Sequence, residues 1–372
     1  MTPLRFVVAP QEFKGSLTAA QAAAAIAAGI RDALPDAALD IAPMSDGGAG
    51  LVDALLSAHG GRRIETPVHD PLMRPVRAVW ALLADGSAAI EMAAASGLVL
   101  LAPGERNPLA ATTFGTGELI RAALAYGCRE LIVGVGGSAT VDGGAGAMQA
   151  LGAHLRDAAG DDLPPGGGPL ARLASIDLSA RDHRLAGACI RVASDVTNTL
   201  CGPQGAAAIF GPQKGATPET VPVLEAALRH LAAIALRDTG IDLLPVAGGG
   251  AAGGLGAGLI LVAGATIEPG FPLVAAAAHL GERIAAADCV ITGEGRLDAQ
   301  TAFGKTASGV AALARAHDRR VGVVAGLVEG QPPDYDVIEQ ATPPGTPPEA
   351  AMRDAAALVR AAAARAARAL AT

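Results

Sequence analysis

The sequence has 372 residues, enough for about two domains of ordinary size. Its formal net charge is −8, from 28 basic and 36 acidic residues, and it holds one tryptophan, two tyrosines and six phenylalanines. Nucleic-acid binding needs basic residues to neutralise phosphates and aromatic rings to stack on bases, so this composition disfavours nucleic acid as a partner. Glycine and proline, at 48 and 25 residues, stay below the share typical of disordered chains, which excludes a disordered or collagen-like protein.

The cysteines and the apolar segments indicate where the protein resides. Cys128, Cys189, Cys201 and Cys289 are far apart and form no CxxC pair, so we expect reduced, buried thiols. The N-terminal residues lead directly into a strand-like run without a signal-peptide layout. Segment 243–267 carries no charge, but its glycines and its proline favour a loop entering a buried helix over a membrane span. The sequence thus predicts a cytoplasmic protein with no membrane partner.

Short β-branched runs alternate along the chain with long alanine-rich segments of helical character. This alternation predicts α/β units built around largely parallel strands. In chain order we expect strands at 5–9, 131–135, 289–292 and 321–325. Helices are expected at 18–34, 116–126, 219–237, 306–317 and 349–370. Segments 159–168 and 331–348 are rich in glycine or proline and are expected to form exposed loops.

Lysine is scarce in this chain. Only three of the 28 basic residues are lysines, namely Lys14, Lys214 and Lys305, and each has a glycine neighbour. A lysine ammonium group is a compact, mobile charge, whereas an arginine guanidinium group is a planar fork that needs room. Lysine beside flexible backbone suits an anionic ligand such as phosphate, with three ordinary surface lysines as the alternative.

Acidic residues occur in glycine-rich loops at the expected strand ends. They are Asp46, Asp142, Asp195, Glu294 and Asp298. Ligands of open α/β sheets bind beyond the carboxyl ends of strands, where carboxylates can hold Mg²⁺ or accept a proton from a substrate hydroxyl group. Any single one of them could instead be a helix cap or a turn former.

Two glycine-rich stretches resemble phosphate-binding loops only in part. Residues 304–306 end like a P-loop but lack its first glycine, and residues 134–139 match G-x-G-x-x-A after a strand. The sequence after this match delays any helix until about residue 144, which disfavours a nicotinamide-dependent dehydrogenase. From the residues alone we infer a phosphate-handling α/β enzyme with lysine and carboxylate loops.

Several motifs, taken in their order along the chain, resemble those of the bacterial type 1 glycerate kinase family. They are APQEFKGSL (9–17), PMSDGGAG (43–50), EMAAASGL (91–98), RNPLAATTFGTGELI (106–120), GVGGSATVDGGAGAMQALG (134–152), FGPQKGAT (210–217) and TGEGRLDAQTAFGKT (292–306). The resemblance implies ATP-dependent phosphorylation of D-glycerate with Mg²⁺ as cofactor. It also implies two α/β domains with largely parallel sheets and the active-site cleft between them. We expect a discontinuous flavodoxin-like domain at 1–70 plus 285–372 and a second domain at 71–284.

On this interpretation each candidate residue has an expected role. Lys14 and Lys305 would neutralise the phosphate oxygens, and Lys305→Ala is expected to lose kcat strongly while the fold persists. Asp195 would orient and deprotonate the acceptor hydroxyl group, with Asp46 as the alternative. Glu294 and Asp298 would hold Mg²⁺.

The remaining candidates would bind substrate or ATP. The loops at 136–144 and 248–258 would contact phosphate or nucleotide through backbone N–H groups, and Arg296 would hold the substrate carboxylate. The other candidates for binding are Gly136, Gly137, Ser138, Thr140, Asp142 and Lys214.

The chain departs from the family pattern within these motifs. The departures are Gln11, Glu12, Ala49, Leu51 and Val141. The resemblance favours the 2-hydroxyl group as acceptor, to give 2-phosphoglycerate. The departures leave open a 3-phosphoglycerate-forming enzyme, a kinase of a related small hydroxy acid, and a non-catalytic ligand-binding homologue. We expect a monomer or a homodimer.

Overall fold

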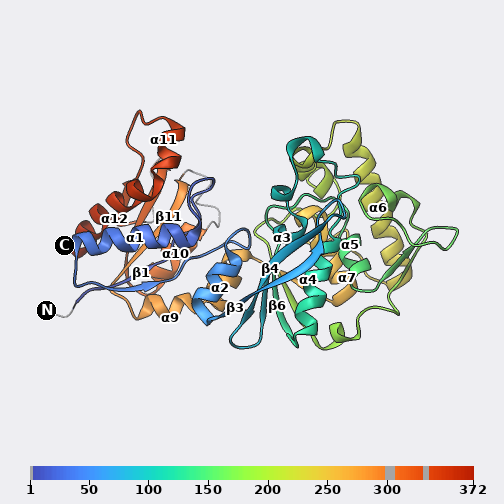
Figure 1. Cartoon of the computed structure of the whole chain (residues 1–372), viewed down its shortest axis with the longest axis horizontal. Helices are drawn as coiled ribbons and strands as arrows, with labels where there is room; N and C mark the ends of the chain where they lie inside the picture. Colours follow the sequence, from blue (N-terminus) through green and yellow to red (C-terminus); the bar gives the residue numbers. More distant parts are fainter. Residues whose placement is uncertain (1–2, 298–305, 330–334) are drawn as a thin grey trace. The chain divides into compact units, whose positions relative to one another are not determined.

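The computed structural model describes residues 3–297, 306–329 and 335–372 (Figure 1). The chain forms two compact units, one made of residues 1–46, 53–60 and 271–372 and the other of residues 47–52 and 61–270. We call them unit 1 and unit 2. The domain borders expected near residues 70 and 284 stay a prediction.

Unit 1 is built on a sheet of five strands whose neighbours all pair in parallel. In spatial order the strands are β13 (Val337–Gln340), β12 (Arg320–Val328), β11 (Cys289–Leu297), β1 (Arg5–Val8) and β2 (Ala38–Ile41). Its helices are α1 (Ala19–Ala33), α2 (Leu51–His59), α8 (Gly270–Ala277), α9 (Leu280–Ala285), α10 (Thr306–Ala316), α11 (Pro348–Arg353) and α12 (Ala355–Ala371). Helices α2 and α8 begin at residues of unit 2.

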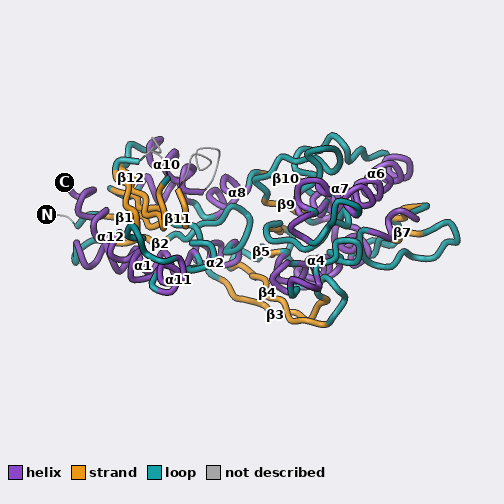
Figure 2. Tube along the Cα trace, turned by 90° about the horizontal axis from the view of Figure 1, so that it is seen from above, coloured by secondary structure: helices purple, strands orange, loops and turns teal. Residues whose placement is uncertain are grey.

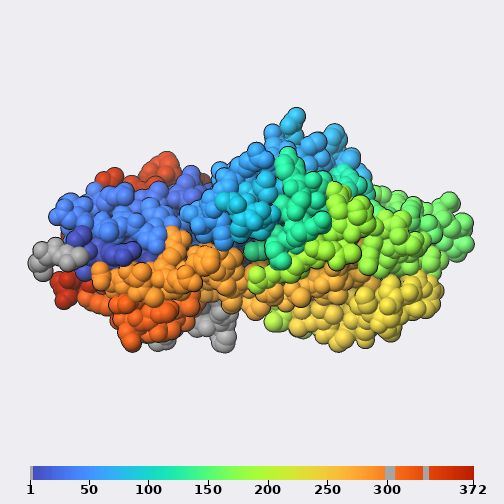
Figure 3. Space-filling model, turned by 90° about the horizontal axis from the view of Figure 1, so that it is seen from below, coloured from blue at the N-terminus to red at the C-terminus, as the bar shows by residue number. Residues whose placement is uncertain are grey.

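Alternate side chains of β1 face the two sides of this sheet, as the period of a strand requires. Phe6 and Val8 pack in one core with residues of α1 and α12, whereas Val7 packs in a second core with residues of α8, α9 and α10. Figure 2 shows α10 on one side of the sheet and α1 and α11 on the other. The space-filling view places the N-terminal residues beside the C-terminal ones, as expected from the packing of α1 on α12 (Figure 3).

The close contact of α1 with α12 depends on Gly29. A Cβ atom at Gly29 would lie 2.2 Å from the carbonyl oxygen of Arg360 and 3.0 Å from the backbone nitrogen of Ala364. We therefore predict that Gly29→Ala lowers the free energy of unfolding of this helix pair by about 1–3 kcal/mol, which hydrogen–deuterium exchange of α1 measures. The control is Gly281→Ala in α9, where the new Cβ meets only His317 Nε2, at 3.7 Å, and alanine is the better helix former. Equal exchange in the two variants would contradict the prediction.

Unit 2 contains a mixed sheet of six strands. In spatial order they are β10 (Thr266–Glu268), β9 (Cys189–Ala193), β6 (Glu130–Gly134), β5 (Ala88–Glu91), β4 (Pro75–Leu83) and β3 (Gly61–His69). The first four are parallel, and β3 and β4 add an antiparallel hairpin. A separate pair joins β7 (His154–Arg156) to β8 (Ser175–Asp177). The helices are α3 (Ala93–Ser96), α4 (Phe114–Ala125), α5 (Ala145–Ala150), α6 (Thr220–Thr239) and α7 (Leu255–Ala263).

These elements confirm the α/β class with largely parallel sheets, whereas the flavodoxin-like name stays a prediction. The expected helix at 349–370 is instead two helices, because Asp354 leaves the helical conformation at φ −98° and serves as the N-cap residue of α12. The four cysteines are free thiols, but Cys189 is exposed, so the expectation of burial was wrong at that position. Among the described residues, no helix has both the length and the apolar character needed to cross a bilayer.

Candidate functional site

The unit 1 sheet brings three predicted residues to one edge. Lys14 follows β1, Asp46 follows β2, and Glu294 lies in the last part of β11. The strand order reverses between β1 and β11. In agreement with this reversal, α1 packs on one face of the sheet and α10 on the other. Open α/β sheets bind ligands at such a point, beyond the carboxyl ends of the strands.

The loop after β1 is fixed by backbone hydrogen bonds. The N–H group of Gln11 donates to the carbonyl oxygen of Gly293 in β11 (2.8 Å), and Phe13 and Leu17 close a tight turn around Gly15, whose φ is +81°. The side-chain amide of Gln11 donates to Asp46 Oδ2 at 3.2 Å. A residue that departs from the family pattern thus contacts a predicted catalytic residue.

Charges around this loop influence one another. The pKa of the Glu12 carboxyl group is raised, first by partial burial and then by the negative charge of Asp46, while Lys14 acts in the opposite direction. The Lys14 side chain is exposed, and within the described part of the chain it makes no hydrogen bond or ion pair. Its ammonium group is therefore available to an anion.

The other unit 1 candidates lie at or beyond the end of β11. Arg296 is exposed and its guanidinium group pairs with the Glu329 carboxylate at 2.5 Å. Asp298 and Lys305 lie outside the described residues. Among residues 3–297, 306–329 and 335–372, no group of three or more histidine, cysteine, aspartate or glutamate residues could hold a metal ion.

Unit 2 collects a second set of candidates at the ends of the adjacent strands β6 and β9. Gly136, Gly137 and Ser138 follow β6, with Gly137 exposed and Ser138 buried. Asp195 follows β9 and is exposed, and its Oδ1 atom accepts a hydrogen bond of 2.6 Å from the N–H group of Gly270.

The two glycine-rich loops predicted to bind phosphate, 136–144 and 248–258, pack against each other. The N–H group of Gly143 donates to the carbonyl oxygen of Gly253 (2.9 Å), and a Cβ atom at Gly253 would lie 1.9 Å from the carbonyl oxygen of Thr140. Only glycine at this position permits so close an approach of the two backbones. The structure therefore brings these loops together within unit 2.

Asp142 is fully buried, and its carboxylate accepts hydrogen bonds that hold the loop at 136–144 in place. Thr113 donates to Asp142 Oδ2 from its backbone N–H group (2.8 Å) and its hydroxyl group (2.9 Å). The N–H groups of Gly144 and Gly146 donate to the same carboxylate at 3.0 and 3.2 Å. Burial raises the pKa of Asp142, and these four donors oppose the shift by favouring the ionised form.

Lys214 is also buried, with 1% of its surface exposed. Its Nζ atom donates a hydrogen bond of 2.8 Å to the carbonyl oxygen of Thr140, in the loop that ends at Asp142. Burial lowers the pKa of Lys214 to about 7, although the charge of Asp142 opposes the shift. Lys214 and Lys14, which look alike in sequence, are therefore placed in opposite environments.

The low pKa of Lys214 leads to a prediction on pH dependence. Between pH 7 and the ordinary lysine pKa of 10.5, the unfolded chain binds the extra proton, so the free energy of unfolding rises with pH. Relative to Lys214→Met, the wild-type protein should gain about 2 kcal/mol of stability from pH 7 to pH 9. Urea titrations followed by the fluorescence of Trp80, the single tryptophan and a buried residue of unit 2, measure this difference. A difference that does not change with pH would contradict the prediction.

Sequence reasoning overlooked several residues that shape these loops. Thr113 received no role, although it supplies two of the hydrogen bonds to Asp142. Glu91, at the end of β5, accepts a hydrogen bond of 2.9 Å from the N–H group of Val52 and was also missed. In the sequence, the only indication that Thr113 and Glu91 matter is that both lie in motifs that carry the family resemblance.

Comparisons with known proteins agree over almost the whole chain. The profile of the glycerate kinase family matches residues 6–371. A glycerate kinase of Haemophilus influenzae is 48% identical over 336 residues, 90% of this chain and 88% of that protein. A glycerate 2-kinase of Escherichia coli K12 is 46% identical over 338 residues, 91% of this chain and 88% of that protein. The crystal structure of a Salmonella typhimurium LT2 protein assigned as glycerate kinase 2 superposes with a TM-score of 0.89 at 46% identity, covering 98% of each chain. The chain therefore belongs to the glycerate kinase family.

Proposed function

We propose that the protein transfers the terminal phosphoryl group of ATP to the 2-hydroxyl group of D-glycerate, forming 2-phosphoglycerate. Family membership makes the chain a kinase, and a kinase of this family takes ATP as its phosphoryl donor. The names of the relatives support glycerate as acceptor, and the name of the Escherichia coli relative supports the 2-position. The observation that carries the proposal is the exposed ammonium group of Lys14 at the point where the strand order reverses, in the loop in which Gln11 donates to Asp46.

Positioning and charge neutralisation supply most of the catalysis in phosphoryl transfer. Lys14 and Lys305 neutralise negative charge on the transferred group. Asp195 orients the acceptor hydroxyl group and takes its proton, and Asp46 is the alternative base. Asp195 Oδ1 accepts the Gly270 hydrogen bond, which holds the carboxylate in one orientation.

Mg²⁺ fits the donor chemistry of this region. The ion is commonly bound by one or two carboxylates together with substrate phosphates, so it needs no larger protein cluster. Glu12 and Asp46 lie near each other at this edge, since partial burial and then the charge of Asp46 raise the pKa of Glu12, and Glu294 is a further, buried carboxylate at the end of β11. We assign Glu294 and Asp298 to the ion, which neutralises phosphate charge when bound.

The unit 2 loops bind through their backbone. The ligand is bound by the backbone of the residues that directly follow β6, which are Gly136, Gly137 and Ser138. The shape of this loop is held by the contacts of Thr140, Asp142 and Lys214. Arg296 gives up its ion pair with Glu329 and binds the substrate carboxylate in its place, because an exposed ion pair costs little to break.

A phosphorus NMR spectrum of the product formed from ATP and D-glycerate tests the proposal. A 2-phosphoglycerate resonance together with ADP formation is the expected result. A 3-phosphoglycerate resonance would correct the position, and the absence of ADP release would contradict the acceptor or the activity. Because Gln11 contacts Asp46, the same assay with a panel of small hydroxy acids tests whether the departures have shifted the acceptor.

A further inference from the structure

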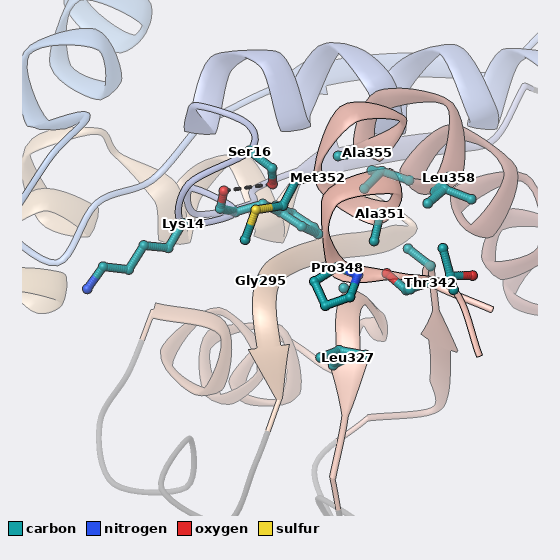
Figure 4. A pocket seen from close by; sticks show the side chains of 15 residues that line it. Lys14, Ser16, Gly295, Leu327, Thr342, Pro348, Ala351, Met352, Ala355 and Leu358 are labelled. Carbon is teal, nitrogen blue, oxygen red and sulfur yellow. Dashed lines mark hydrogen bonds between the residues drawn. The ribbon is translucent and has the colours of Figure 1, made fainter. Parts of the chain in front are cut away.

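A pocket of about 190 Å³ opens beside the loop that carries Lys14 (Figure 4). It lies wholly within unit 1, and α11, the start of α12, and the ends of β11 and β12 enclose it. The residues that line it are Phe13, Lys14, Ser16, Gly295, Gly326, Leu327, Ala341, Thr342, Thr346, Pro348, Ala351, Met352, Ala355, Leu358 and Val359. The roles proposed above use only Lys14 of this set.

Most of this lining is apolar. Leu327 and Met352 leave 45% and 54% of their surfaces exposed, so the wall of the pocket includes apolar surface that a ligand can cover. The hydroxyl group of Thr342 makes no hydrogen bond within the described part of the chain, whereas that of Ser16 donates to the carbonyl oxygen of Phe13 at 2.9 Å. The Thr346 hydroxyl group likewise donates, to the carbonyl oxygen of Pro343 at 2.8 Å. The pocket thus offers apolar walls together with the Thr342 hydroxyl group, whose donor is available to a ligand.

The position of the pocket is one that binds ligands in this type of sheet. Gly295 and Gly326 belong to the last parts of β11 and β12, and Ala341 directly follows β13. The pocket is therefore at the carboxyl edge, next to the loop that follows β1. At Gly295 a Cβ atom would lie 3.2 Å from the backbone nitrogen of Lys14, so the strand end and the loop are in close contact.

Lys14 adds a positive charge at the rim. Figure 4 shows its side chain extending away from the apolar residues, with the ammonium group outside the pocket. A ligand that suits this arrangement has an apolar ring system at one end and an anionic group at the other. D-glycerate has no ring system to bury there, whereas a nucleotide has both parts.

We propose that this pocket binds the adenine ring of ATP and ADP, with the phosphate groups directed toward Lys14. The proposal rests on the proposed function in taking ATP as the phosphoryl donor. A volume of about 190 Å³ is below the roughly 300–1,000 Å³ that enclose a whole drug-sized ligand, so the pocket holds one ring system and leaves the phosphates outside. The Thr342 hydroxyl group is the polar group that orients the ring.

Isothermal titration calorimetry with ADP and with inorganic tripolyphosphate tests this assignment. Ala351→Phe fills the pocket from α11, and Ala350→Phe is the matched control, because Ala350 is also partly buried on the same helix but does not line the pocket. We expect Ala351→Phe to weaken ADP binding by about tenfold or more while the tripolyphosphate affinity stays within about twofold. Ala350→Phe should match the wild-type protein for both.

A second variant tests the pocket if Ala351→Phe fails to fold. Met352→Ala removes an exposed apolar wall and should weaken ADP binding without changing the affinity for tripolyphosphate. Unchanged ADP affinity in both variants, or an equal loss for ADP and tripolyphosphate, would overturn the adenine assignment.

If the wild-type protein binds ADP in this pocket but does not phosphorylate D-glycerate, the pocket stands and the proposed acceptor fails. If instead the wild-type protein phosphorylates D-glycerate and both variants bind ADP normally, the proposed function stands and the pocket assignment fails.

Discussion

Replacing Lys14 by alanine should lower kcat for phosphoryl transfer about 100- to 1,000-fold, the usual loss when one charge-stabilising donor is removed. The transition state of phosphoryl transfer carries negative charge on its oxygens, and Lys14 offers an exposed ammonium group at the carboxyl edge of the unit 1 sheet. A coupled assay of ADP release with D-glycerate measures the loss. The fold should persist, because this side chain makes no hydrogen bond within the described part of the chain.

Two further variants separate a specific role for Lys14 from a general effect of charge. Lys14→Arg keeps the charge but replaces a compact ammonium group with a planar fork, so it should recover only part of the turnover. Arg368→Ala removes an exposed positive charge from α12 in the same unit and should leave kcat unchanged. If Lys14→Ala retained turnover within about twofold of the wild type, Lys14 would have no part in the chemistry.

The sequence predicted best those elements whose local signals agree with their burial. The strand expected at 5–9 is β1 (Arg5–Val8), and the helix expected at 18–34 is α1, which begins after a capping box formed by Thr18 and Gln21. The hydrophobic pattern and the cap point to the same boundaries there. By contrast, the hairpin of β3 and β4 was not predicted, because the two strands mix arginine, proline and apolar residues without a clean alternation.

The candidate site shows where local patterns stop being informative. Lys14 and Lys214 both precede a glycine, yet one is exposed and the other donates to Thr140, a residue 74 positions away. No property of the FKGS or QKGA segment indicates which lysine another loop will cover. The segment expected to be an exposed loop at 331–348 instead contains strand β13 (Val337–Gln340), which pairs with β12, so that expectation was wrong there. Its proline-rich sequence also gave no sign that Thr342 and Thr346 line a pocket. Long-range packing decides such placements.

Asp142→Ala should lower the free energy of unfolding of unit 2 by about 3–5 kcal/mol, because the change breaks a buried, hydrogen-bonded charge cluster. Thr113, Gly144 and Gly146 would each keep a buried donor without its acceptor, and Lys214 would lose the negative charge that favours its protonated form. Urea titration followed by Trp80 fluorescence measures the loss.

The size of this loss distinguishes a framework role for Asp142 from one confined to ligand contact. A carboxylate whose partners all lie on a ligand can be removed from the free protein at little cost, whereas Asp142 satisfies donors of its own chain. Asp142→Asn, which keeps the volume and one acceptor oxygen, should lose less than the alanine variant. Asp161→Ala, at an exposed position of unit 2, should stay within about 0.5 kcal/mol of the wild type. A loss below about 1 kcal/mol for Asp142→Ala would mean that the loop at 136–144 keeps its shape without this carboxylate. Asp142 would then act through contact with the ligand and not as part of the framework.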